Sequence, residues 1–222
     1  NDQPLNLPQI ELPYGWGTNI VAHDLAANTT VWTWCSGAYK IDSRTVGIAG
    51  GKFFVNVPGS CVAALDAMTG SELWRNTDPD TIALIDVSFN NYFGGWVHRP
   101  NPAMTCTTNT ITMCTHGKSN VVTLATDDGR YLWHTYRVSG GRTMHQLAAD
   151  GYIHLHPAQY AGMIRTYDRV TGAFVGNNIG RITSCAGVVA CPDSAFGGGG
   201  RSYSFVSKST RGTEGLKTEC EI

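Results

Sequence analysis

The sequence predicts an all-β fold, a β-propeller of four or five blades that is stabilised by disulfides. The first observation is a phrase of 13 residues that recurs along the chain. Its period of about 40 residues is typical of repeat architectures such as propellers. The second observation is a turn in the middle of each copy, between two strand-like runs. The third is that no convincing long amphipathic helix can be traced.

The phrase is clearest in VAALDAMTGSELW, which covers Val62–Trp74. Weaker copies cover Val21–Trp32, Val121–Trp133 and Ile164–Gly176. The positions equivalent to Asp66 are separated by 42, 59 and 43 residues and hold Asp24, Asp66, Ala125 and Asp168. We interpret the Cys106–Cys114 segment in the longest interval as an insertion. A further step reaches Lys208, where a fifth, degenerate copy has neither Asp nor Trp.

Each copy is predicted to be a hairpin that is fastened at its turn. Asp66 can accept hydrogen bonds from backbone N–H groups of the turn, and Gly70 can adopt a positive φ there. Trp74 can then bury its ring against the neighbouring unit. An amphipathic helix through the same residues is opposed by Thr69-Gly70, since glycine is unfavourable inside helices. The same roles are predicted for Asp24, Trp32, Gly129, Trp133, Asp168, Thr171 and Gly172.

The remaining elements follow from alternation and turn residues. Residues 1–17 are Pro-rich and predict an extended arm, and residues 18–222 predict a single propeller domain. Gly50-Gly51 predicts the turn of a hairpin over Val46–Val57, and residues 76–105 predict a mixture of loop and strand. Other strands are predicted at Trp32–Trp34, Cys61–Ala67, Thr110–Thr115, Val121–Ala125, Tyr131–Tyr136, Met144–His156 and Ile164–Tyr167.

Seven cysteines are many for a reducing cytosol and favour an oxidising compartment. Their spacings predict two local disulfides, Cys106–Cys114 and Cys185–Cys191, neither of which has the CxxC spacing of a zinc site. A Cys35–Cys61 disulfide would tie one unit to the next and leave Cys220 unpaired or in an intermolecular bond. Alternatively, Cys220 pairs with Cys35 or Cys61 and ties the end of the chain to its start.

Charge and hydropathy exclude some classes of protein. The net charge of −1 offers no electrostatic basis for binding nucleic acid or an anionic membrane. No apolar run approaches the length of about 18 residues that a membrane span requires. The chain begins at Asn1 without a signal peptide, as either a mature secreted chain or a fragment would. Asn28-Thr29-Thr30 is an N-glycosylation sequon, which together with the cysteines predicts a secreted, extracellular glycoprotein.

The pattern A-x-D-x-x-T-G-x-x-x-W at Ala64–Trp74 resembles the tryptophan-docking repeat of the pyrroloquinoline-quinone-like propellers. The resemblance extends over most of residues 18–176. That superfamily includes quinoprotein alcohol dehydrogenases and also non-catalytic scaffolds, so the resemblance implies the fold and leaves the function open.

The resemblance also indicates what a quinone enzyme would need. Such enzymes are much longer, eight-bladed rings that hold the cofactor between a Trp and a disulfide of two adjacent cysteines, beside a calcium ion. This chain has no adjacent cysteine pair. His154 and His156, with His145 nearby, do not supply a convincing metal site, because a site needs three or four converging ligands. Ser184 and Ser202 lack a G-x-S-x-G context. We therefore expect no enzyme activity, no cofactor and no metal.

The sequence thus predicts a non-catalytic, secreted structural or protein-interaction module. The first repeat copy has only the arm before it, so its inner strands must come from the C-terminal region or from a neighbouring molecule. The expected partners are accordingly the protein itself, in an extracellular oligomer or filament, or other extracellular proteins. One alternative is a glycan-binding lectin that stacks sugars on Trp16, Trp34 or Trp96. A less favoured alternative is a quinone-dependent oxidoreductase.

Overall fold

The computed structural model of the chain describes residues 17–42, 45–85, 103–114, 121–135, 144–149, 151–157 and 164–178. It also describes the backbone of four strands at residues 188–191, 194–199, 202–207 and 213–216. The predicted N-terminal arm, except for Gly17 at its end, and Lys208 of the degenerate fifth copy lie outside these ranges.

The described strands form one two-stranded sheet and four four-stranded sheets, all antiparallel. The two-stranded sheet is the hairpin of β1 (Asn19–Asp24) and β2 (Thr29–Cys35). Next come β3 (Val46–Ala49), β4 (Lys52–Val57), β5 (Cys61–Asp66) and β6 (Glu72–Asn76), then β7 (Ala103–Cys106), β8 (Thr110–Cys114), β9 (Val121–Ala125) and β10 (Tyr131–Thr135). The last two sheets are β11 (Met144–Ala149), β12 (Tyr152–Pro157), β13 (Ile164–Asp168) and β14 (Phe174–Asn178), and β15 (Val188–Cys191), β16 (Ser194–Gly199), β17 (Ser202–Ser207) and β18 (Thr213–Leu216).

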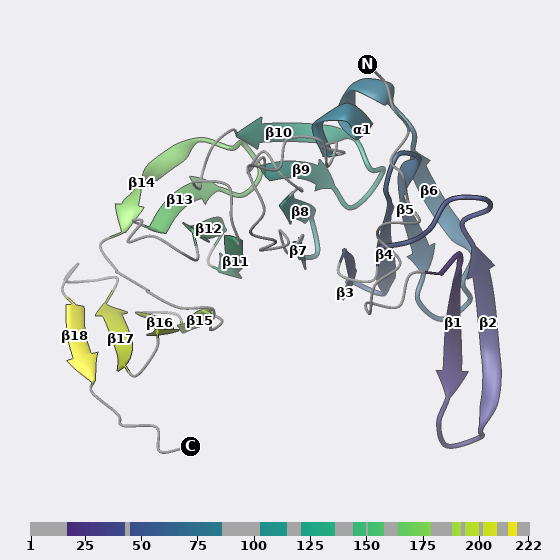
Figure 1. Ribbon diagram of the computed structural model, residues 1–222, viewed down its shortest axis with the longest axis horizontal. Coiled ribbons are helices and arrows are strands. Elements are labelled where there is room, and N and C mark those ends of the chain that lie inside the picture. The colour runs from purple at the N-terminus through teal and green to yellow at the C-terminus, as the bar shows by residue number, and fades with distance from the viewer. Residues whose placement is uncertain are drawn as a thin grey trace, which may run out of the picture.

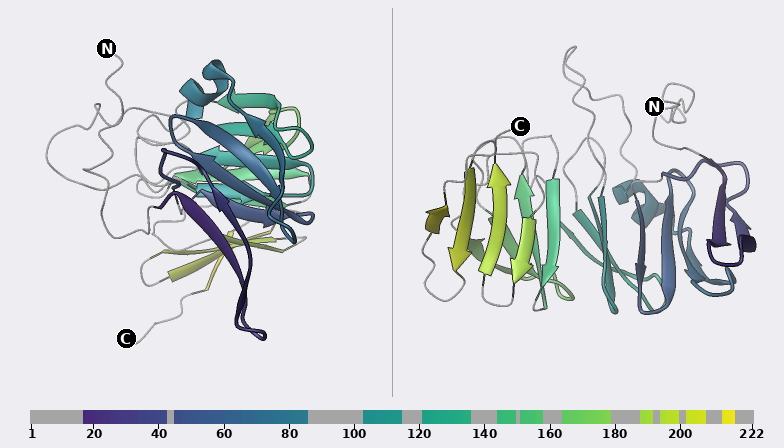
Figure 2. Two further views of the ribbon diagram at one scale, coloured as in Figure 1. Left: turned by 90° about the vertical axis from the view of Figure 1, so that its right-hand side faces the viewer. Right: turned by 90° about the horizontal axis from the view of Figure 1, so that it is seen from below.

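The sheets follow one another around an arc (Figure 1). Each four-stranded sheet is ordered as in the sequence, and its first strand lies on the inner side of the arc. These inner strands contact each other in series, β3 with β7, β7 with β11, and β11 with β15. When the arc is seen edge-on, the strands of successive sheets lie roughly along one common axis, with their directions alternating within each sheet (Figure 2, right). The prediction of an all-β fold is therefore confirmed.

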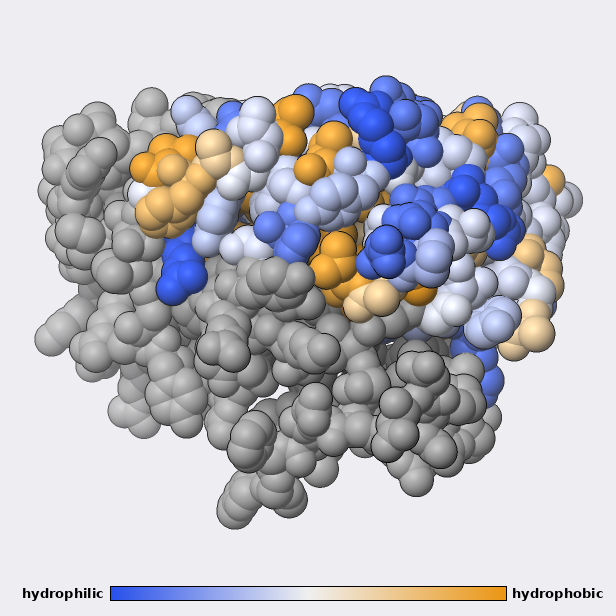
Figure 3. Space-filling model, turned by 90° about the horizontal axis from the view of Figure 1, so that it is seen from above, coloured by the Kyte–Doolittle hydropathy of each residue, from blue (hydrophilic) through white to orange (hydrophobic). Residues whose placement is uncertain are grey.

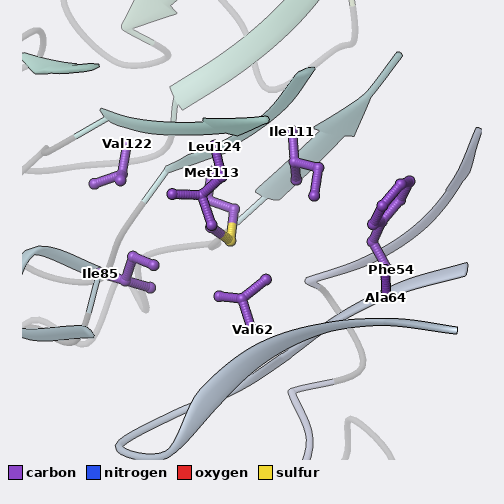
Figure 4. Packing of buried hydrophobic residues seen from close by; sticks show 8 residues of the cluster. All are labelled: Phe54, Val62, Ala64, Ile85, Ile111, Met113, Val122 and Leu124. Carbon is purple, nitrogen blue, oxygen red and sulfur yellow. The ribbon is translucent and has the colours of Figure 1, made fainter. Parts of the chain in front are cut away.

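The hydrophobic core lies between the sheets. Strand β5 is buried on both faces, which explains its unbroken apolar sequence. Val62 and Ala64 face Ile111, Met113, Val122 and Leu124 of the β7–β10 sheet (Figure 4). Cys61, Ala63 and Leu65 face Trp34 and Ile20 of the hairpin. Burial of each large apolar side chain contributes about 1.5–3 kcal/mol to the free energy of folding. Packing between neighbouring sheets therefore makes a large contribution to the stability of the fold.

Helix α1 (Pro79–Ile85) lies in a stretch for which the sequence predicted only loop and strand. The Asp78 carboxylate accepts hydrogen bonds from the backbone N–H of Thr81 at 3.0 Å and from its hydroxyl at 2.6 Å. Asp at the N-cap followed by Pro at the first helical position is a recognised start signal, so the helix could have been predicted. Ile85 packs against the core between two sheets, and the buried contact stabilises this short helix.

The predicted disulfides Cys106–Cys114 and Cys35–Cys61 are not found among the described residues. Cys35, Cys61 and Cys106 are free thiols. Cys106 lies opposite Ile111 and Cys114 opposite Ala103, so the two cysteines lie three residue steps apart along one ladder. That offset is about 10 Å, well beyond the 4.4–6.8 Å between Cα atoms that a disulfide needs.

Cys35 and Cys61 are likewise not bonded to each other, and their side chains lie in different environments. Cys35 is exposed, whereas Cys61 is buried and its Sγ accepts a hydrogen bond from Arg75 Nη1 at 3.3 Å. Burial raises the pKa of the Cys61 thiol, and it raises that of Cys106 to about 12, so both resist ionisation. Cys185, Cys220 and the side chain of Cys191 lie outside the described residues.

Candidate functional site

Three turns, those after β1, β5 and β13, are built around an aspartate. Asp66 Oδ1 accepts the backbone N–H of Met68 at 2.9 Å and of Thr69 at 2.8 Å, and the Thr69 hydroxyl at 3.0 Å. Asp168 Oδ1 accepts the same three bonds from Val170 and Thr171, at 3.0, 2.8 and 2.8 Å. Asp24 Oδ1 accepts two, from Ala26 at 2.8 Å and Ala27 at 3.0 Å. The repeat pattern indicates this arrangement for all three aspartates.

The turn that has Ala125 in place of Asp keeps the same backbone. The Gly129 N–H donates to the Ala125 carbonyl at 3.1 Å, as the Gly70 N–H does to Asp66 at 2.8 Å. The Ala125 N–H donates to the Arg130 carbonyl at 2.9 Å, which matches the bond from Asp66 to Ser71. The backbone bonds therefore define the turn, and the carboxylate adds stability to it.

Hydrogen bonds to the ionised form lower the pKa of each of these carboxyl groups. The largest cause for Asp66 is the backbone N–H of Thr69, followed by the Thr69 hydroxyl. For Asp168 it is the backbone N–H of Thr171, and for Asp24 that of Ala27. A carboxyl group whose pKa is lower in the folded state stabilises the fold above its unfolded pKa, and this contribution is lost as the pH falls through the folded pKa.

We expect the free energy of unfolding to decrease as the pH falls below about 4, the ordinary pKa of an aspartate. The double variant Asp66→Asn, Asp168→Asn keeps neutral acceptors in both turns but cannot titrate. Urea unfolding followed at several pH values should therefore show a shallower acid dependence for this variant than for the wild type. Equal acid dependence in the two proteins would contradict the role assigned to these carboxylates.

Three tryptophans each join one sheet to the next, from the β1–β2 hairpin as far as the β11–β14 sheet. The Nε1–H of Trp32 donates to the Ala67 carbonyl at 3.1 Å, that of Trp74 to Thr126 at 3.0 Å, and that of Trp133 to Arg169 at 2.9 Å. In each case the acceptor is the residue that follows the Asp position of the next turn. We call each such contact a tryptophan dock.

A glycine completes each dock. Gly70, Gly129 and Gly172 have φ of 71°, 75° and 72°, a region that favours glycine. A Cβ atom at these positions would lie 2.6, 2.5 and 2.5 Å from the rings of Trp32, Trp74 and Trp133. The glycine thus serves two purposes, since it allows the turn conformation and leaves room for the indole.

The β11–β14 sheet receives a tryptophan dock but has no tryptophan on its own last strand, β14. Trp74 lies opposite Ala64, and Trp133 lies opposite Thr123, but the equivalent place opposite Thr166 holds Gly176. On the same sheet, His154 Nδ1 and Thr166 Oγ1 are 2.9 Å apart, in the positions that Phe54 and Ala64 occupy in the β3–β6 sheet. The sheet face that follows the last dock is therefore polar.

Several contacts between sheets had no signal in the sequence. Lys52 Nζ donates to the Thr126 carbonyl at 2.8 Å, so this oxygen accepts from both Lys52 and Trp74. Asn76 Nδ2 donates to the Gly129 carbonyl at 2.7 Å. The partners lie 74 and 53 residues apart along the chain, which is why sequence patterns could not connect them.

Trp34 was a candidate for sugar stacking, and the structure places it in the core with only 8% of its surface exposed. Its Nε1–H donates to Glu72 Oε2 at 3.2 Å, and the Arg75 guanidinium lies 5.6 Å from its ring centroid. Arg75 also forms an ion pair with Glu72. Trp34 therefore holds the hairpin to the β3–β6 sheet. Trp16 and Trp96 lie outside the described residues.

Within the described ranges, no three His, Cys, Asp or Glu side chains gather in a way that could hold a metal ion. The side chains of His145 and His156 are not among those described. No helix of the described chain is long and apolar enough to cross a bilayer. On the surface seen in Figure 3, hydrophobic residues of the described part lie in small groups between hydrophilic ones.

Comparison with solved structures supports the architecture. BamB from Moraxella catarrhalis, a β-propeller repeat protein, aligns with a TM-score of 0.61 and 15% identity, over 90% of this chain and 56% of BamB. The computationally designed Ika8 protein aligns with a TM-score of 0.53 and 12% identity, over 82% of this chain and 51% of Ika8.

The chain thus spans about half the length of either structure. No known sequence family and no curated protein matches the chain. At identities this low, the likeness bears on the fold alone, and it supports a β-propeller-like arrangement of the sheets.

Proposed function

We propose that this protein is a non-catalytic propeller of the pyrroloquinoline-quinone-like type that acts as an extracellular structural or protein-interaction module. The observation that best supports this proposal is the series of three tryptophan docks at Trp32, Trp74 and Trp133. The recurring residues of the repeat contact neighbouring sheets, so their role is to join sheets into a rigid arc. A rigid arc of this kind presents surfaces for binding other proteins.

The proposal includes self-assembly, which the edge of β1 supports. Third strands β5, β9, β13 and β17 each pair on both sides, whereas β1 pairs only with β2 in the described part of the chain. The centre of β1 is apolar, and Val21 is 55% exposed. An unprotected edge strand accepts a strand from another molecule. A strand from a neighbouring copy would extend the hairpin toward the four strands of the other sheets.

Light scattering coupled to size exclusion, over a range of concentrations and with and without reductant, tests the proposal. We expect oligomers that grow with concentration and persist in reductant, because pairing at the β1 edge uses backbone hydrogen bonds and needs no disulfide. Val21→Lys adds a charge on the β1 edge and is expected to weaken assembly. Val31→Lys is the matched control, since Val31 is equally exposed at 56% but lies on β2. A wild-type protein that stays monomeric at the highest concentration would overturn the self-assembly proposal.

A further inference from the structure

The hairpin turn has an asparagine at the position where the docked turns have a glycine. Asn28 follows Asp24 by four residues, as Gly70 follows Asp66 and Gly172 follows Asp168. Asn28 also has a positive φ, of 52°, which asparagine tolerates better than most residues. The hairpin turn therefore shares the positive φ and the bonds to the aspartate carboxylate with the turns at Asp66 and Asp168, but it has a side chain where those turns have none.

That side chain prevents a tryptophan dock on the hairpin turn. At the three docked glycines, a Cβ atom would lie within 2.6 Å of the indole. Asn28 has a Cβ atom, so an indole could not lie over this turn as it does over the others. The turn is accordingly open to solvent, with Leu25 89% exposed and Asn28 exposed as well.

The Asn28 carboxamide is also oriented by a neighbour. Its Oδ1 lies 3.2 Å from Nε2 of His23. Because the oxygen takes this contact, the amide nitrogen Nδ2 is the atom left to react, and no hydrogen bond among the described residues uses it. Thr30 is the third residue of the sequon, two residues after Asn28. It is exposed near the start of β2, where its backbone lies opposite His23.

We propose that Asn28 is an N-glycosylation site and that its glycan caps the undocked end of the arc. The proposal rests on the extracellular role given above. The co-substrate is an oligosaccharide linked to a lipid pyrophosphate. A bond forms between Nδ2 and C1 of the first sugar, the C1–O bond to the pyrophosphate breaks, Nδ2 loses one proton, and the lipid pyrophosphate leaves. No atom is oxidised or reduced.

A glycan at this position has a structural consequence. It covers the undocked turn, and it adds a hydrophilic group to the turn that contains the exposed Leu25. Assembly would then be directed to the β1 edge, since the β1–β2 turn cannot accept a dock. The capped turn and the open edge together restrict the ways in which copies can associate.

The test is synthesis of the full chain, with a cleavable signal peptide added, in the presence of microsomes and in a secreting eukaryotic cell. The readout is a mobility shift that an amidase reverses, with peptide mass spectrometry to locate the Asp that the amidase leaves at position 28. We expect most translocated molecules to be modified, and Thr30→Ser to keep the modification. Asn28→Gln and Thr30→Ala should abolish it.

The outcomes distinguish this proposal from the function on which it rests. Translocated, protease-protected chains without a glycan would overturn the Asn28 site, whether or not the protein reaches the medium. Glycosylated chains that reach the medium but stay monomeric would uphold the site and contradict self-assembly. Asn28→Gly removes the sequon and restores a dock glycine, so it should fold like the wild type and lack the glycan. A shift that survives in Asn28→Gly would place the modification elsewhere and overturn the proposal.

Discussion

Gly172→Ala is expected to destabilise the protein by about 2–3 kcal/mol. A left-handed backbone costs a non-glycine residue about 1–2 kcal/mol. In addition, the new Cβ would lie 2.5 Å from the Trp133 ring, so the indole must move and its hydrogen bond to the Arg169 carbonyl is lost or lengthened. The loss of that bond adds about 1 kcal/mol. Equilibrium unfolding in urea, monitored by tryptophan fluorescence, measures the effect.

Gly151→Ala provides a matched control. Gly151 has a φ of 82°, but a Cβ atom there would meet nothing within 4 Å. This variant should therefore show the backbone cost alone, about 1–2 kcal/mol. The difference between the two variants isolates the dock. Equal losses of stability at Gly151 and Gly172 would show that the close approach of the indole contributes nothing.

Trp133→Ala is expected to cost about 3–5 kcal/mol, as large-to-small substitutions of buried aromatic residues do. Trp133 is 6% exposed and stacks on Tyr167 with ring centroids 5.9 Å apart. Its removal would leave a cavity between two sheets and leave the Arg169 carbonyl without its indole donor. Chemical denaturation gives the loss of free energy, and hydrogen exchange should show faster opening of β10 and β13.

Trp133→Phe separates the two parts of this effect. Phenylalanine keeps an aromatic ring against Tyr167 but cannot donate to Arg169, so its cost should be nearer 1–2 kcal/mol. If Trp133→Ala were no more destabilising than Trp133→Phe, the indole would contribute by its N–H alone. The packing role assigned to the ring would then be wrong.

Much of the local structure followed from residue type. The turn at Thr69-Gly70 and the hairpin at Gly50-Gly51 were predictable because positive φ favours glycine. The strand at Cys61–Asp66 was predictable from its apolar residues. Helix α1 was missed although Asp78-Pro79 carries its start signal, because the surrounding stretch has no helical periodicity long enough to reveal it.

The predicted Cys106–Cys114 disulfide is absent for a different reason. Spacing along the chain places Cys106 near Cys114, but the register of β7 against β8 puts the two residues at opposite ends of their ladder. Register depends on which side chains face the core, and a count of intervening residues does not contain that information.

By itself, the sequence determined the repeat unit, with an aspartate turn, a glycine of positive φ and a tryptophan after it, because these depend on backbone preferences within a dozen residues. Only the tertiary structure decided what each unit touches. It showed that Trp133 lies over Gly172 of the next sheet and that Lys52 and Trp74 share the Thr126 carbonyl. It also showed that Asn28 adopts the positive φ of the glycines at the docks. Such contacts join residues that are distant along the chain, and the packing of whole sheets brings them together.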